Sequence, residues 1–156
     1  MRKGGVLMDE IKWLREMLRQ ELDLMAPSLA RIGKKNVMIK DENDGLIAHA
    51  RLSARWNGHE INAFVIDPAH RGKGISHEVL ERCGDGRLFA YTRDARLRSA
   101  LLRAGFERRR TPGPVALLSV MVARASSVFW MVVLLEFRRL HHQLVNLFRY
   151  ELFVRE

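Results

Sequence analysis

The chain has 156 residues, which fits one domain or one domain with an appendage, and its 47% apolar content excludes a globally disordered protein. The single cysteine, Cys83, excludes a disulfide framework or a cysteine-based zinc cluster and fits a reducing compartment, so we expect a cytoplasmic protein. The formal net charge of +9 suits an anionic partner such as a polyphosphate cofactor, nucleic acid or an acidic surface.

The first half of the chain predicts one amphipathic helix followed by strands. Apolar residues recur at helical spacing over residues 9–25, with Asp9 as candidate N-cap and Pro27 as a stop. Strands are expected at 37–40, 46–53 and 60–66, with a hairpin turn at 41–45. The apolar stretch at 4–8 is too short for a secretory signal peptide, so none is expected.

The second half predicts alternating helices and strands. The expected elements are a helix at 76–83, a strand at 88–92, a helix at 94–104 ended by Gly105, a strand at 106–110, an apolar strand at 115–123 and a long helix from Ser126 to near the C-terminus. This order predicts an α+β fold. We expect one domain over residues 1–124 and a helical extension over residues 125–156.

The most informative motif is the glycine-basic loop Arg71-Gly72-Lys73-Gly74-Ile75-Ser76, which lies between a predicted strand and a predicted helix. Glycines allow backbone N–H groups to converge on one point, and a helix N-terminus adds partial positive charge, so the loop predicts an anion site. It matches neither the Walker A pattern nor the dinucleotide-binding fingerprint. A plain solvated turn is the alternative interpretation.

The segment 64–76 resembles the signature of GNAT-type acyl-CoA N-acyltransferases, in which a loop of this kind follows a strand and opens a helix. The segment 94–106 is similar to a later helix of that family, which ends in Gly-Phe. The resemblance covers residues 8–124 and implies a mixed, mostly antiparallel sheet flanked by helices, with acetyl-CoA as co-substrate. The residues that it implies for cofactor binding are Val65, Ile66, Arg71, Gly72, Lys73, Gly74, Ile75 and Ser76.

The same resemblance implies transfer of an acetyl group to an amine, which must lose a proton to a general base. Glu60 is the candidate base or water-orienting residue, with His59 and His70 as substitutes. Leu101 stands where the family often carries a tyrosine acid, so Tyr91 is the candidate acid instead. The acceptor, a protein amine or a small amine, is not identified. The alternative function is an assembly component with weak or absent catalysis, for example a virion-associated protein.

Residues 87–110 hold eight arginines against Asp94 and Glu107. This stretch fits capture of the CoA 3′-phosphate, an acidic partner or a solvated helix face. Nucleic-acid binding is not favoured, because aromatic residues do not interleave with the arginines.

The stretch 115–135 is apolar at 17 of its 21 positions, a length that nearly spans a bilayer. Arg124 falls near its middle, where a charge is costly, so a strand followed by a helix is favoured over a membrane segment, which stays open.

The apolar stripe of the last helix predicts a homo-oligomer or assembly interface through residues 126–156. His141 and His142 are adjacent on that helix and do not converge, so no metal site is expected.

Overall fold

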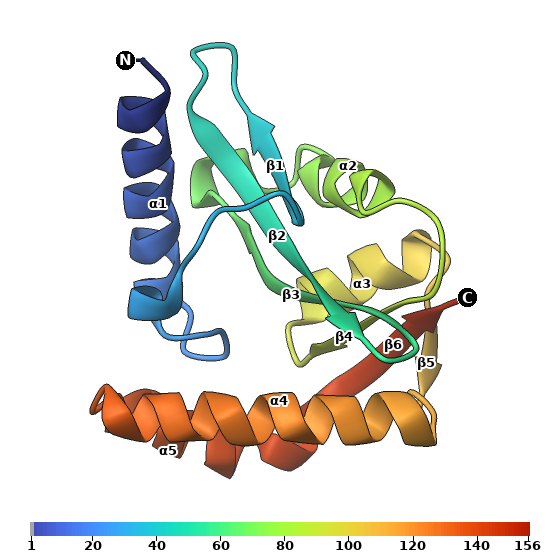
Figure 1. Cartoon of the computed structure of the whole chain (residues 1–156). Coiled ribbons are helices and arrows are strands. Elements are labelled where there is room, and N and C mark those ends of the chain that lie inside the picture. The colour runs from blue at the N-terminus through green and yellow to red at the C-terminus, as the bar shows by residue number, and fades with distance from the viewer. Residues whose placement is uncertain (1) are drawn as a thin grey trace.

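A computed structural model describes the backbone of residues 2–156 and the side chains of residues 7–156 (Figure 1). Its centre is a six-stranded sheet in the order β1-β2-β3-β4-β6-β5. The strands are β1 (Asn36–Lys40), β2 (Leu46–Arg55), β3 (Gly58–Ile66), β4 (Leu88–Thr92), β5 (Glu107–Arg109) and β6 (Glu151–Arg155). Only β3 and β4 pair in parallel among the described strands. The expected α+β class with a mixed, mostly antiparallel sheet is confirmed.

Helices cover both faces of this sheet (Figure 1). They are α1 (Arg2–Gln20), α2 (Ile75–Arg82), α3 (Ala95–Arg103), α4 (Pro114–Val133) and α5 (Phe137–Val145), with 3-10 turns η1 (Pro27–Leu29), η2 (Pro68–His70) and η3 (Leu147–Arg149). On one face, α2 and α3 pack on β2 and β4 through residues such as Leu80 and Leu101. On the other face, α1 packs through Leu14 and Leu18, and α4 packs through Val120. The sheet is therefore sandwiched between two helical layers.

The N-terminal helix differs from its prediction at both ends. It begins at Arg2 rather than after Asp9, and it ends at Gln20 rather than near residue 25. Asp9 is therefore an exposed position inside the helix, not its cap. The helix ends early for a physical reason. The buried guanidinium of Arg139 donates to the carbonyl oxygens of Leu18 and Glu21, at 2.8 and 2.7 Å, in place of the backbone N–H groups of a further helical turn.

The predicted strand at 115–123 is wrong, because α4 runs without a break from Pro114 to Val133. Proline at the first helical position favours this start, and a short apolar run fits a buried strand or a helix equally well. The predicted helix from Ser126 to near the C-terminus is also wrong. It breaks after Val133, and residues 151–155 form β6, which pairs with both β4 and β5. The expected boundary between the domain and its extension, residue 124, thus lies inside α4, and β6 completes the sheet.

By length and composition, α4 is the helix in the described part of the chain that could cross a bilayer. Only 17% of its most apolar window is buried. Its buried positions, Ala116, Val120 and Met131, form the stripe that faces the protein. The helix therefore packs on the sheet along one side and leaves a wide apolar face outside.

Candidate active site

The parallel strands β3 and β4 pair over only a short stretch and then separate. Residues His59 and Glu60 of β3 pair with Leu88 and Phe89 of β4, and β4 then continues its pairing with β6. Near Ala63, which has a positive φ of 48°, the register between β2 and β3 shifts by one residue. A bulge of this kind bends a strand and re-aims its side chains. The result is an opening between β3 and β4 that widens beyond Glu60.

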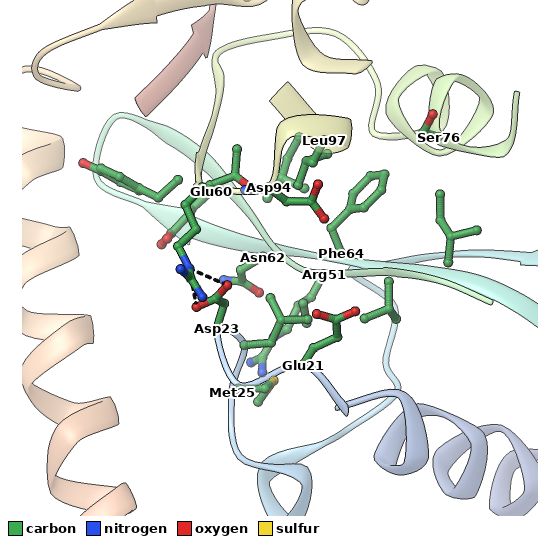
Figure 2. Close-up of a pocket in the computed structure, with 18 of the residues that line it drawn as sticks. Glu21, Asp23, Met25, Arg51, Glu60, Asn62, Phe64, Ser76, Asp94 and Leu97 are labelled. Atoms are coloured by element: carbon green, nitrogen blue, oxygen red, sulfur yellow. Dashed lines mark hydrogen bonds and ion pairs between the residues drawn. The ribbon is translucent and has the colours of Figure 1, made fainter. Parts of the chain in front are cut away.

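A cavity of about 1420 Å³ fills this opening (Figure 2). Before the bulge, Glu60 and Asn62 share a sheet face with Arg51 and Ser53, their partners on β2. Beyond it, Phe64 packs on the opposite side, with the α2 and α3 layer. The cavity thus reaches both faces of the sheet, and we call its α2–α3 side the loop end and its α1–α4 side the acceptor end.

The glycine-basic loop forms the loop end. Gly72 and Gly74 have φ values of 79° and 80°, in the region that favours glycine, and α2 begins directly afterwards at Ile75. A Cβ atom on either glycine would meet open space within 4 Å. Within the described part of the chain, no acceptor contacts the backbone N–H groups of residues 72–76. These N–H groups, at the N-terminus of an eight-residue helix, suit an anion.

Arg71 folds back beside this loop. Its Nε donates to the carbonyl oxygen of Ile66 at 3.2 Å, and its Nη2 lies 3.4 Å from a carboxylate oxygen of Glu21. Seven of the eight residues predicted to hold the cofactor line the cavity: Val65, Ile66, Arg71, Gly72, Gly74, Ile75 and Ser76. The eighth, Lys73, is exposed and is not part of the cavity wall.

Glu60, the predicted base, lies where β3 and β4 part, and its side chain is almost fully buried. Its Oε2 accepts hydrogen bonds from Nε (2.9 Å) and Nη2 of Arg55, and its Oε1 accepts one from Nη2 of Arg124 at 2.9 Å. A carboxylate offers about four lone-pair sites. Three are used here, which leaves one on Oε1. His70, a substitute base, lines the cavity, and His59 does not.

Tyr91, the predicted acid, also lines the cavity, on β4. The Arg124 guanidinium lies 5.6 Å from the centre of its ring. Burial, followed by the charge of Glu60, raises the pKa of Tyr91 above its ordinary value, so the phenol stays protonated at neutral pH. Leu101 is fully buried in the core and is not part of the cavity wall. A side chain at position 101 therefore packs beneath α3.

A polar network that the sequence analysis missed forms one wall of the acceptor end. Asp23 accepts hydrogen bonds from Arg93 Nε and from the hydroxyl of Tyr150, both at 2.8 Å, and lies 2.9 Å from His142 Nε2. Burial alone would raise the pKa of Asp23, but the bonds from Arg93, Tyr150 and His142 together hold it below its ordinary value. The network joins residues that are far apart in the sequence.

Helix α5 fixes the backbone next to Asp23. Besides the carbonyls of Leu18 and Glu21, Arg139 donates to the carbonyl of Leu24 at 2.8 Å, and the Gln143 amide donates to those of Leu22 and Leu24. Arg139 is only 2% exposed. The segment after α1, which walls the acceptor end, is therefore held by side chains from near the C-terminus.

Arg124, which the sequence analysis did not place in the site, left a signal in the sequence. Arg124 is the only charged residue between Arg110 and Glu136. A lone charge in an apolar helix needs a partner, and here the partner is Glu60. His142 belongs to the Asp23 network, whereas His141 is exposed.

Comparison with solved structures gives the same fold. Rv2747 from Mycobacterium tuberculosis, solved in complex with CoA, aligns with a TM-score of 0.61 at 16% identity, over 93% of this chain and 92% of that one. N-acetylglutamate synthase from Neisseria gonorrhoeae, complexed with coenzyme A and N-acetyl-glutamate, aligns with a TM-score of 0.55 at 17% identity, over 93% of this chain and 31% of that one. No curated protein sequence matches the chain.

A family model described as the acetyltransferase (GNAT) family matches residues 8–85. That range is half of the chain, and it contains the bulged strand, the glycine-basic loop and the helix that follows. Members of this family use acetyl-CoA as co-substrate. The part of the sequence that builds the loop end of the cavity is thus the part that the family model describes, and the chain belongs to the acetyltransferase (GNAT) family.

Proposed function

We propose that this protein is an acetyl-CoA-dependent N-acetyltransferase that acts on an amine. The observation that carries the proposal is the row of N–H groups over residues 72–76, which have no acceptor among the described residues and lie at one end of a cavity between two parted strands. The cavity is larger than a typical single-ligand site, so two substrates can meet in it.

The loop end fits the diphosphate of the cofactor. The N–H groups of residues 72–76 would donate to its oxygens, and Arg71 would add a full positive charge. Backbone groups of Val65 and Ile66, at the edge of β3 that β4 has left, would pair with the extended arm of the cofactor. Arg96 and Arg103 of α3 also line the cavity and are available to the 3′-phosphate.

The acceptor end would carry out the proton transfers. Acetyl-CoA supplies the acetyl group as a thioester. The amine nitrogen forms the new C–N bond, its proton leaves to the free lone pair of Glu60 Oε1, directly or through a water, and the C–S bond breaks. The protonated hydroxyl of Tyr91 would return a proton to the thiolate.

Calorimetry with acetyl-CoA and a thiol-release assay with mixed amines test this function. We expect binding, and release that Glu60→Gln reduces about 100-fold, within the range for loss of a general base. Because this variant removes a buried charge, its acetyl-CoA affinity serves as the check that it is folded. Absence of binding at millimolar acetyl-CoA would reject the proposal, and an equal rate in Glu60→Gln would remove Glu60 from the mechanism.

The second candidate function, an assembly component, is favoured by the outer face of α4. We define this face by the large exposed apolar residues of α4 that do not line the cavity: Val115, Leu117, Leu118, Met121, Val122, Val128, Phe129, Val132 and Val133. It carries no charge, because Arg124, whose half-exposed side chain is ion-paired with Glu60, lies on the cavity side of α4. We propose that a second copy covers it, because pairing this face with itself brings no like charges together in spite of the net charge of +9.

Light scattering after size-exclusion chromatography tests this pairing. We expect a dimer, and a monomer for Phe129→Glu. A wild-type monomer at every concentration would contradict the proposal that a second copy covers this face. Sedimentation of the protein with lipid vesicles, in place of self-association, would contradict it too.

A further inference from the structure

The cations at the acceptor end divide into paired and unpaired groups. Arg55 and Arg124 contact Glu60, and Arg93 contacts Asp23. Arg51, which also lines the cavity, has no carboxylate within ion-pair distance. The six residues whose side chains are not described contain no aspartate or glutamate, so none of them can be its partner.

Arg51 lines the cavity from the central part of the sheet. It is half-buried on β2, directly opposite Asn62 of β3. Figure 2 shows it on the side of Met25 and Glu21, away from Phe64 and Leu97. Two residues earlier on β2, burial and the charge of Arg51 outweigh the hydrogen bond to the Ala63 carbonyl and hold the pKa of His49 below its ordinary value, so this histidine adds no second charge. Arg31 also lines the cavity without a carboxylate within ion-pair distance among the described residues, but it is exposed. Arg51 is therefore the half-buried guanidinium of the acceptor end whose charge no carboxylate compensates.

The neighbours of Arg51 supply a complementary contact for an amine. Asn62 donates its amide N–H to the Ser53 hydroxyl at 2.8 Å, which leaves the amide oxygen of Asn62 without a partner among the described residues. Glu60 is opposite Ser53, so Arg51 and Glu60 are diagonal neighbours, with Cα atoms about 7–8 Å apart. A small molecule that carries both an amine and an anionic group can span that distance.

We infer that the acceptor is an amine that also carries a carboxylate, and that Arg51 is the residue that binds this carboxylate. The inference rests on the proposed acetyltransferase function and adds the substrate class to it. The planar guanidinium offers two parallel N–H groups to a carboxylate, and the oxygen of Asn62 accepts from the amine, which is then held on the side of Glu60.

Matched pairs of acceptors test the substrate class: free amino acids against their carboxamides, with the same amine in both. In the thiol-release assay we expect kcat/KM to be at least about tenfold higher for the acids, the range for a charge-assisted contact. Arg51→Met should remove that preference, chiefly through KM. It should reduce the rate with the carboxamides far less than the rate with the acids, and it should leave the affinity for acetyl-CoA unchanged.

Arg110→Met is the control, since Arg110 is exposed and lies outside the cavity. Equal rates for acids and carboxamides, or equal loss of both in Arg51→Met, would overturn the carboxylate inference while leaving the acetyltransferase in place. Acetyl-CoA binding without thiol release from any acid would also overturn it. Absence of acetyl-CoA binding would instead remove the proposed function, and the acceptor with it.

Discussion

The two ends of the cavity are built from different parts of the polypeptide. The anion site of the loop end consists of backbone N–H groups and two glycines from one continuous stretch, residues 71–76, with α3 beside it. The acceptor end consists of charged side chains from several separate segments, tied in pairs such as Glu60 with Arg124 and Asp23 with Arg93. Backbone donors recognise any diphosphate, whereas placed side chains discriminate between acceptors. Substitutions should therefore affect binding at one end and acceptor use at the other.

The largest effect on stability is expected at the acceptor end. Arg139→Met removes the buried guanidinium that bonds the carbonyls of Leu18, Glu21 and Leu24, and should lower the free energy of unfolding by about 3 kcal/mol. Denaturant unfolding measures the loss. Arg138→Met, the exposed neighbour, should change it by less than about 0.5 kcal/mol. Equal values for the two variants would show that α5 does not hold this wall.

At the loop end, Gly74→Val should weaken acetyl-CoA binding by about 100-fold, or roughly 2.7 kcal/mol. A β-branched residue is strained at the φ of 80° found there, so the N–H groups would turn from their common direction. Calorimetry gives the affinity. Gly33→Ala serves as the control, because a Cβ atom at Gly33 has free space and no positive φ is required. Unchanged affinity in Gly74→Val would place the diphosphate elsewhere.

Arg124→Met should impair the acceptor end of the cavity without affecting the loop end. It removes one of the two guanidinium partners of Glu60, so kcat should fall about tenfold through loss of positioning. Acetyl-CoA affinity should stay the same, because Arg124 lies away from the loop. The kinetic assay and calorimetry together check this, and a parallel loss of affinity would contradict the division into two ends.

The smallest effect concerns pH. Since the folded-state pKa of Asp23 lies below its ordinary value, its ionised form stabilises the fold above the unfolded-state pKa, near about 4. That contribution disappears as the pH falls through the folded-state pKa. Asp23→Asn should thus melt at a lower temperature than the wild type at pH 7, and the gap should close in acid. Asp85→Asn, at an exposed position, should show no gap, and a gap for Asp23→Asn that is constant with pH would contradict the role of this charge.

The sequence predicts the loop end of the cavity well and the acceptor end poorly. The loop, its flanking strand and helix, and β4 are local features with their own turn signals, and all were predicted at nearly the right boundaries. The Asp23 network could not be predicted, because it joins residues more than 45 positions apart through the tertiary fold. The segment 115–123 failed for another reason. Its apolar run fits a buried strand or a helix, and the place beside β4 is taken by β6.

The position of β6 between β4 and β5 also has a consequence for biosynthesis. As the polypeptide leaves the ribosome, β4 and β5 are made well before residues 151–155, so each has an unpaired edge until the last strand arrives. During that interval the nascent chain can associate wrongly through those edges, and chaperone protection would matter most then. A fragment that stops before residue 151 would keep those edges open permanently.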